Sequence, residues 1–236
     1  GPSRIDIESL NKLAAEMAPD AILKHSTPEE FFEQVEKSGE ELPEFEGELN
    51  PWGVGCYTSQ IKLKQKYRAV ENQLYSVERM CSAAQIAGVM AYPKSELEEV
   101  QRDMLMCQFH DILAGTSILP GEQGALRTLD HGLEILSKLR ARAFFALAAS
   151  QRKAQPDEIP ILIYNPHPFE IEGDFECEMM LWGGSFDEVF SMPQVYRDGE
   201  ALPTQPEKEQ SNLSIDWRKR VVFHTTLAPM QLNRFD

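Results

Sequence analysis

Apolar residues recur at helical spacing through the middle of the chain. Between residues 63 and 84 they are spaced alternately four and three positions apart, and no Gly or Pro interrupts them: Leu63, Tyr67, Val70, Leu74, Val77, Cys81 and Ala84. A heptad stripe of this kind is typical of a helix that packs along another helix. A second stripe follows Pro93: Leu97, Val100, Met104 and Cys107. A third begins near Pro120: Ala125, Leu129, Leu133, Leu136, Leu139, Ala143 and Ala146. Three such helices with short connections predict an antiparallel three-helix bundle over residues 53–152.

Capping signals predict where several helices begin. An amphipathic pattern predicts a helix over residues 6–18. Thr27 followed by Pro28 is typical of a cap and a first helical residue, and this second helix should end near Gly39. Ser95 and Glu98 have the spacing of a capping box, which predicts that the helix after Pro93 begins there.

The chain changes character after a polar linker at residues 151–158. Four short runs favour strands: residues 159–164, 175–181, 194–196 and 221–226. Asp198-Gly199 is typical of a two-residue hairpin turn. Short strands with turn signals predict a β-sandwich. About 80 residues is short for a complete sandwich, so residues 158–236 are expected to be its first part, in a longer protein.

Composition excludes several classes of protein. Lys and Arg number 23 against 38 Asp and Glu, giving a net charge of −15, and no basic cluster exceeds three residues. Nucleic-acid binding is therefore not expected. The longest apolar run, residues 143–149, is far shorter than the ~20 residues that span a bilayer, so no membrane association is expected. Four cysteines without a CxxC pair favour reduced thiols and a cytoplasmic location.

One segment, residues 107–118, concentrates chemically capable side chains where a helix ends. His110 is followed by Asp111, and an imidazole beside a carboxylate can bind a metal, relay a proton or hydrogen-bond a sugar. The simpler interpretation is a helix end in which Asp111 hydrogen-bonds locally. The remaining histidines are isolated along the chain, so it can supply only one or two metal ligands: His25, His131, His167 and His224.

An acidic run over residues 40–48 offers a second candidate. Such runs are usually solvated loops. Glu48, however, lies just before Trp52, and an aromatic neighbour can raise the pKa of a carboxylate and suit it to general-acid catalysis. Trp52 also has the flat surface on which a sugar ring can stack.

The segment QFHDILAGTSI, residues 108–118, resembles the QFHDILPGSSI-like signature of glycoside hydrolase family 38, the α-mannosidases. Three weaker similarities follow the family's order. Gly1–Arg4 resembles the end of its DHGGGP[ST] segment, Gly47–Leu49 with Gly55–Ser59 resembles its GEL…G-x-Y-T-[ST] stretch, and Ile163–Pro166 resembles the opening of its β-region. The resemblance covers essentially the whole chain. Ala114 departs from the signature, which has Pro there, and this should loosen the turn slightly.

The resemblance implies an α+β multidomain fragment. Residues 1–52 would be the C-terminal tail of an α/β catalytic domain, followed by the three-helix bundle and the first part of a β-sandwich. It also implies a retaining, zinc-dependent hydrolysis of α-mannosides. His110 corresponds to a zinc ligand, Asp111 to a contact of the bound mannose, and Glu48, more loosely, to the general acid/base.

The family's other zinc ligands and its nucleophilic Asp would precede residue 1, so the fragment alone should be inactive. The expected ligand is a mannoside or a mannose-containing oligosaccharide, and homo-oligomerisation stays open. The alternative hypothesis is a non-catalytic helical and β module that binds carbohydrate or a protein partner.

Overall fold

The computed structural model describes residues 3–20, 22–49, 52–186, 190–207 and 216–236. The chain divides into two compact units, residues 1–51 and residues 52–236, which are described separately. Gly1 and Pro2, which open the first of the weaker family similarities, lie outside the described residues. Among the residues that are described, no helix is both long and apolar enough to cross a membrane.

The first unit contains two helices, α1 (Arg4–Met17) and α2 (Pro28–Ser38). Thr27 caps α2 as predicted, because its hydroxyl accepts a hydrogen bond of 3.2 Å from the Glu30 amide. The helix ends at Gly39, whose left-handed backbone (φ 68°) suits glycine. No described residue of this unit is buried, so the apolar faces of both helices are uncovered.

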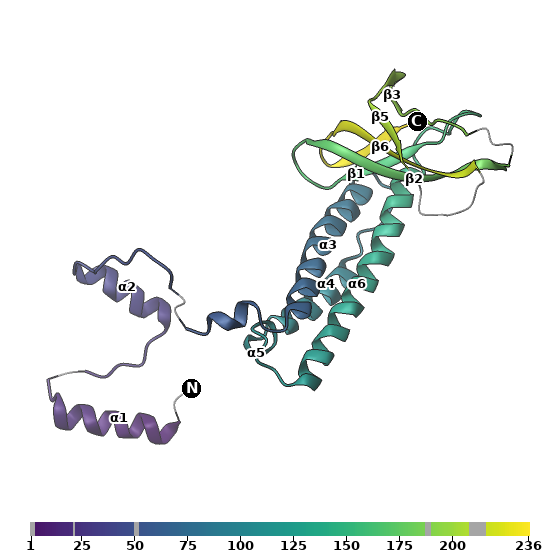
Figure 1. Cartoon of the computed structure of the whole chain (residues 1–236). Coiled ribbons are helices and arrows are strands. Elements are labelled where there is room, and N and C mark those ends of the chain that lie inside the picture. The colour runs from purple at the N-terminus through teal and green to yellow at the C-terminus, as the bar shows by residue number, and fades with distance from the viewer. Residues whose placement is uncertain (1–2, 21, 50–51, 187–189, 208–215) are drawn as a thin grey trace. The chain divides into compact units, whose positions relative to one another are not determined.

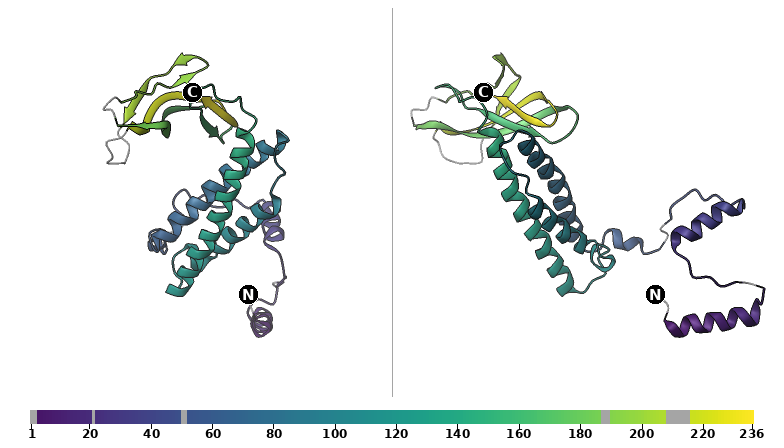
Figure 2. Two further views of the ribbon diagram at one scale, coloured as in Figure 1. Left: turned by 90° about the vertical axis from the view of Figure 1, so that its right-hand side faces the viewer. Right: turned by 180° about the vertical axis from the view of Figure 1, so that it is seen from behind.

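The second unit begins with a short 3-10 helix, Val54–Tyr57, and continues with four α-helices: α3 (Ile61–Ile86), α4 (Lys94–Cys107), α5 (His110–Leu113) and α6 (Leu119–Ala148). The long helices α3, α4 and α6 lie side by side as a bundle (Figures 1 and 2). The α+β fold class predicted from the sequence is confirmed.

The bundle core follows the predicted apolar stripes closely. All seven stripe residues of α3 are buried, from Leu63 to Ala84. On α6 the buried series passes through Gly132, whereas Leu133, the residue expected there, is only partly buried. A Cβ at Gly132 would lie 3.5 Å from Val100 and 3.8 Å from Val70, at ordinary van der Waals distance, so this buried position faces both α4 and α3.

The predicted capping box at the start of α4 is wrong. The helix begins at Lys94, and Ser95 donates instead to the carboxylate of its neighbour Glu96 at 3.0 Å. The Pro93 carbonyl already accepts the first helical hydrogen bond, 3.1 Å from the Leu97 amide. Ser95 therefore lies inside the first turn rather than at the cap position.

The rest of the second unit is antiparallel β-structure. Its strands are β1 (Ile161–Asn165), β2 (Ile171–Ser185), β3 (Tyr196–Arg197), β4 (Glu200–Ala201), β5 (Thr204–Glu207), β6 (Asp216–Leu227) and β7 (Gln231–Phe235). β1 pairs with β7, β6 lies between β2 and β5, and β3 and β4 form a hairpin. Asp198 and Gly199 turn this hairpin with φ values of 52° and 86°, as the Asp-Gly pair predicts.

The sheets share one apolar core. Phe223 on β6 and Phe235 on β7 have ring centroids 5.0 Å apart, which joins the three-stranded sheet to the β1–β7 pair. The predicted strand at 194–196 overlaps β3 at Tyr196 only, and the sequences of β5 and β7 carried no clear strand signal. β7 pairs with β1, whose residues lie about 70 positions earlier in the sequence, so no local pattern signals this strand.

The β-strands lie at the end of the bundle opposite α5 (Figures 1 and 2). Two hydrogen bonds join them to α3: the Tyr164 hydroxyl donates to the Arg79 carbonyl at 3.3 Å, and Arg79 donates to the Pro166 carbonyl at 2.9 Å. Within the second unit, the α5 end of the bundle is therefore free of β-structure.

Candidate functional site

The segment with the family signature folds into a tight turn at the free end of the bundle. α4 ends at Cys107, and the single helical turn α5 follows after Gln108 and Phe109. Gly115 closes the turn with φ 76°. A Cβ on Gly115 would lie 2.8 Å from the Ser59 carbonyl oxygen, so both the backbone angle and the space require glycine.

The turn is fastened to the start of α3 by side-chain hydrogen bonds. The Ser59 hydroxyl donates to the Gly115 carbonyl at 2.7 Å. The Gln60 side-chain amide donates to the Ser117 carbonyl at 3.0 Å. These bonds join segments more than fifty residues apart, and they hold the α5 turn in a fixed position on the bundle.

His110 and Asp111 project from this turn into solvent. The His110 side chain is 77% exposed, and its Nε2 lies 3.3 Å from Asp111 Oδ2. Its ring packs against that of Phe109, with centroids 4.2 Å apart. Thr116 donates to Asp111 Oδ1 at 3.1 Å, as the simpler interpretation of this helix end expects. The local bond therefore orients a carboxylate that is still 57% exposed.

A pocket of about 530 Å³, here named the α3 pocket, lies beside His110. Its lining residues are Cys56, Tyr57, Lys64, Tyr67, Arg68, Gln108, His110, Leu113 and Ala114. They come from the 3-10 helix, from one face of α3 and from the signature segment. Gln108, the first residue of that segment, donates to the Tyr67 hydroxyl and so joins α4 to α3.

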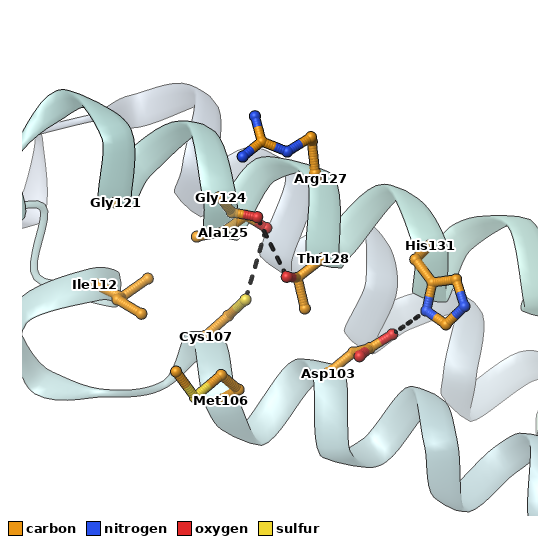
Figure 3. A pocket seen from close by; sticks show the side chains of 10 residues that line it. All are labelled: Asp103, Met106, Cys107, Ile112, Gly121, Gly124, Ala125, Arg127, Thr128 and His131. Carbon is orange, nitrogen blue, oxygen red and sulfur yellow. Dashed lines mark hydrogen bonds and ion pairs between the residues drawn. The ribbon is translucent and has the colours of Figure 1, made fainter.

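A second pocket, of about 600 Å³, lies between α4, α5 and α6 (Figure 3). At one end, His131 Nδ1 is 2.7 Å from Asp103 Oδ2, and its Nε2 is 3.7 Å from Glu99. The hydrogen bond to Asp103 raises the pKa of His131, and the neighbouring carboxylates add to this effect. Sequence reasoning missed the pair because its members lie on different helices, 28 positions apart.

Cys107 also lines this second pocket but does not form a nucleophilic pair with His131. Its thiol is directed at the Ala125 carbonyl, 3.7 Å away, while His131 faces Asp103 (Figure 3). Burial raises the pKa of Cys107 to about 11, so the thiol stays protonated near neutral pH. The cysteine is a core residue.

His224 repeats the His–carboxylate pattern on the β-sheet. Its Nδ1 lies 2.9 Å from Asp174 and its Nε2 3.3 Å from Glu172. The facing strands β2 and β6 bring these residues together, so His224 is isolated in the sequence but not in the fold.

Among the described parts of the chain, no cluster of three or more His, Cys, Asp or Glu side chains could hold a metal ion. The proposed zinc ligand His110 and its neighbour Asp111 supply at most two donors. Glu48 lies in the first unit, in the segment after α2, and its side chain is exposed. Trp52, at the start of the second unit, is 83% exposed.

The helical region of this chain is similar in sequence to regions of known proteins. Residues 54–147 match the family model described as the alpha mannosidase middle domain. Alpha-mannosidase G of Dictyostelium discoideum is 35% identical over 97 residues, which is 41% of this chain and 9% of that protein. Human alpha-mannosidase 2C1 is 29% identical over 177 residues, covering 72% of this chain and 16% of that protein.

A solved structure of a glycosyl hydrolase family 38 protein from Enterococcus faecalis shares the fold. It covers 99% of this chain with a TM-score of 0.65, at 18% identity, and the match takes in 30% of that protein. The chain thus spans under a third of this structure and under a fifth of the curated relatives above.

The α5 turn, its bundle and the family model together define the second unit's helices as an α-mannosidase middle domain. The helical region thus matches the alpha mannosidase middle domain, and its similarity to named α-mannosidases bears out the resemblance that the signature segment indicated.

Proposed function

We propose that this chain is the central part of a retaining, zinc-dependent α-mannosidase, in which His110 binds zinc and Asp111 contacts the sugar. The observation that carries the proposal is the exposed His110–Asp111 pair on a turn fastened rigidly to α3. Groups held on rigid elements keep the geometry that binding and catalysis need. Both residues lie within the matched middle domain.

His110 fits a zinc site as one ligand of several. Neutral imidazole is a common zinc ligand, and this one is exposed and contributes little to the core. A catalytic zinc normally takes about three protein ligands, so the others would come from outside the described residues. When bound, zinc would act as a Lewis acid and orient sugar hydroxyls.

The chain's own residues have distinct roles in this proposal. Asp111, oriented by Thr116, would accept hydrogen bonds from the hydroxyls of the bound mannose. Glu48 would protonate the leaving oxygen and then deprotonate the attacking water, as retention requires of one carboxylate. The second carboxylate, the nucleophile, would lie outside this chain.

Large apolar side chains near the α5 turn in the sequence are exposed: Leu105, Met106, Phe109, Ile118 and Leu119, each at least 49%. Exposed apolar side chains mark an interface where they adjoin one another. We assign these side chains to contact with the domain that carries the remaining zinc ligands and the nucleophile, which would complete the active site next to His110.

The proposed substrate is a mannoside or a mannose-containing oligosaccharide, in keeping with the names of the relatives. A cytoplasmic location is also proposed, and the four unpaired thiols support it.

The test compares His110→Ala with a control, His131→Ala, in the full-length enzyme that contains this segment. Turnover of an aryl α-mannoside and bound zinc are measured on both variants. His110→Ala should lose most activity and most zinc, whereas His131→Ala should keep both. Full zinc and turnover in His110→Ala would leave the alternative, a non-catalytic carbohydrate- or protein-binding module, as the better account.

A further inference from the structure

The α3 pocket carries positive charge in a strongly acidic chain. Lys64 and Arg68 both line it, one helical turn apart on the same face of α3, and no carboxylate is among its lining residues. The chain as a whole has a net charge of −15. A recess lined by one sign of charge concentrates ions of the opposite sign.

Lys64 has hydrogen-bond donors to spare. Its ammonium group donates to the Ser59 carbonyl at 2.6 Å, which uses one of its three protons. The ion pairs found among the described residues do not include Lys64. Its charge is therefore held in place by a neutral carbonyl and is not neutralised by a carboxylate.

Arg68 adds a second cationic group. One of its terminal nitrogens bonds Glu71, and the other donors of the guanidinium remain available. The side chains of Arg68 and Glu71 are 69% and 40% exposed, so water weakens their attraction. Glu71 offsets part of the charge of Arg68 without blocking the guanidinium.

Tyr67, which lies between Lys64 and Arg68 in the sequence, supplies a neutral hydrogen-bond donor. Its hydroxyl oxygen accepts a hydrogen bond from Gln108, which leaves its own proton free to be donated. The residue is only 7% exposed, so the hydroxyl is held in position by the surrounding core. Lys64, Tyr67 and Arg68 together make the pocket rich in donors.

We propose that the α3 pocket binds an anionic group, a phosphate or a carboxylate, carried by the sugar substrate. Charged hydrogen bonds from lysine and arginine to such groups are short and strong. The pocket reaches His110, so a mannoside held there would place its anionic substituent on α3. The sugar part of this inference rests on the proposed function, whereas the anion site itself does not.

Titration calorimetry on the 236-residue chain at low ionic strength tests the anion site. Inorganic phosphate, acetate and methyl α-mannoside are titrated separately, followed by mannose 6-phosphate and mannuronate. We expect Lys64→Gln to weaken phosphate binding at least about tenfold, and added salt to weaken binding to the unsubstituted chain. Comparison of phosphate with acetate, and of the two anionic sugars, shows which anion the pocket prefers.

The control is Lys62→Gln, which makes the same charge change on an exposed position of α3 outside the pocket. It should alter phosphate affinity less than about twofold. Arg68→Gln provides a second variant that breaks no contact with the backbone, and it should weaken binding several-fold even if Lys64→Gln fails to fold.

Absence of phosphate and acetate binding, or equal losses in Lys62→Gln and in the pocket variants, would overturn the inference. If phosphate binds through Lys64 but methyl α-mannoside does not bind and mannose 6-phosphate binds no more tightly than phosphate, the anion site stands and the part of this inference that attaches the anion to a mannoside fails.

Discussion

The pKa of His131 is set by the carboxylates around it. The Asp103 carboxylate accepts a hydrogen bond from His131 Nδ1, and Glu99 from α4 and Glu134 from α6 itself add negative charge nearby. Together they raise the pKa of His131, so the folded chain holds that proton more tightly than the unfolded chain, where the pKa is about 6.5.

This shift predicts a pH-dependent contribution to stability. The His131–Asp103 pair should stabilise the fold fully below about pH 6.5 and lose its effect as the pH rises through the raised pKa of His131. In urea unfolding, His131→Gln should therefore lower the midpoint more at about pH 5.5 than at about pH 8.5. An equal loss at both pH values would show that the pair contributes packing rather than charge. His25→Gln, in the first unit, is the matched control and should leave the midpoint unchanged.

At the scale of elements, the bundle separates residues that hold the fold from residues that present chemistry. Leu74 is 7% exposed in the seam of α3, whereas His110 projects from the short helix α5. Leu74→Ala should therefore cost about 2–5 kcal/mol in the free energy of unfolding, through lost burial and a cavity.

His110→Ala, which removes little packing, should stay within about 0.5 kcal/mol of the unsubstituted chain. Calorimetric melting of both variants measures the contrast, with Gln65→Ala on the exposed side of α3 as a neutral control. If His110→Ala destabilises the chain as much as Leu74→Ala, His110 is a structural histidine.

Two glycines should respond oppositely to the same substitution. Gly115→Ala forces a left-handed backbone on alanine and places its Cβ 2.8 Å from the Ser59 carbonyl oxygen, so it should destabilise by more than about 1 kcal/mol. Gly124 lies inside α6, where the nearest atom to a new Cβ is 4.0 Å away. Gly124→Ala should stabilise the helix by about 0.5–1 kcal/mol. The denaturant midpoints of both variants measure this contrast. If both substitutions shifted the midpoint in the same direction, the α5 turn would not be fixed as described.

At the scale of the whole molecule, the described residues lack the clustered ligands that an independent metal site needs. The 236-residue chain by itself should therefore bind zinc only weakly and should not hydrolyse an activated aryl α-mannoside. Without a nucleophile, acid–base assistance alone supplies roughly 10²–10⁴-fold, well short of enzymatic rates. Calorimetric titration with zinc and a mannosidase assay check both expectations. Submicromolar zinc affinity abolished by His110→Ala would show that the other ligands lie within this chain.

Local signals in the sequence determined most of the helical architecture. Alternating steps of four and three residues placed the core of α3, because a buried stripe must recur on one helical face. Thr27 and Gly39 marked the ends of α2 for the same local reason, and Asp198-Gly199 marked the hairpin turn. The signature segment at residues 108–118 pointed to the family, which the comparisons confirm. The roles of His110, Asp111 and Glu48 remain predictions.

Only the tertiary structure decided which distant residues meet. It placed Gly132 rather than Leu133 among the buried residues of α6, because the packing of α3 and α4 sets which side of α6 is covered. It paired Asp103 with His131, formed β7 against β1, and brought Lys64, Tyr67 and Gln108 around one pocket. Such contacts depend on how helices and strands pack against one another, and a pattern along one element carries no information about the partner that another element supplies.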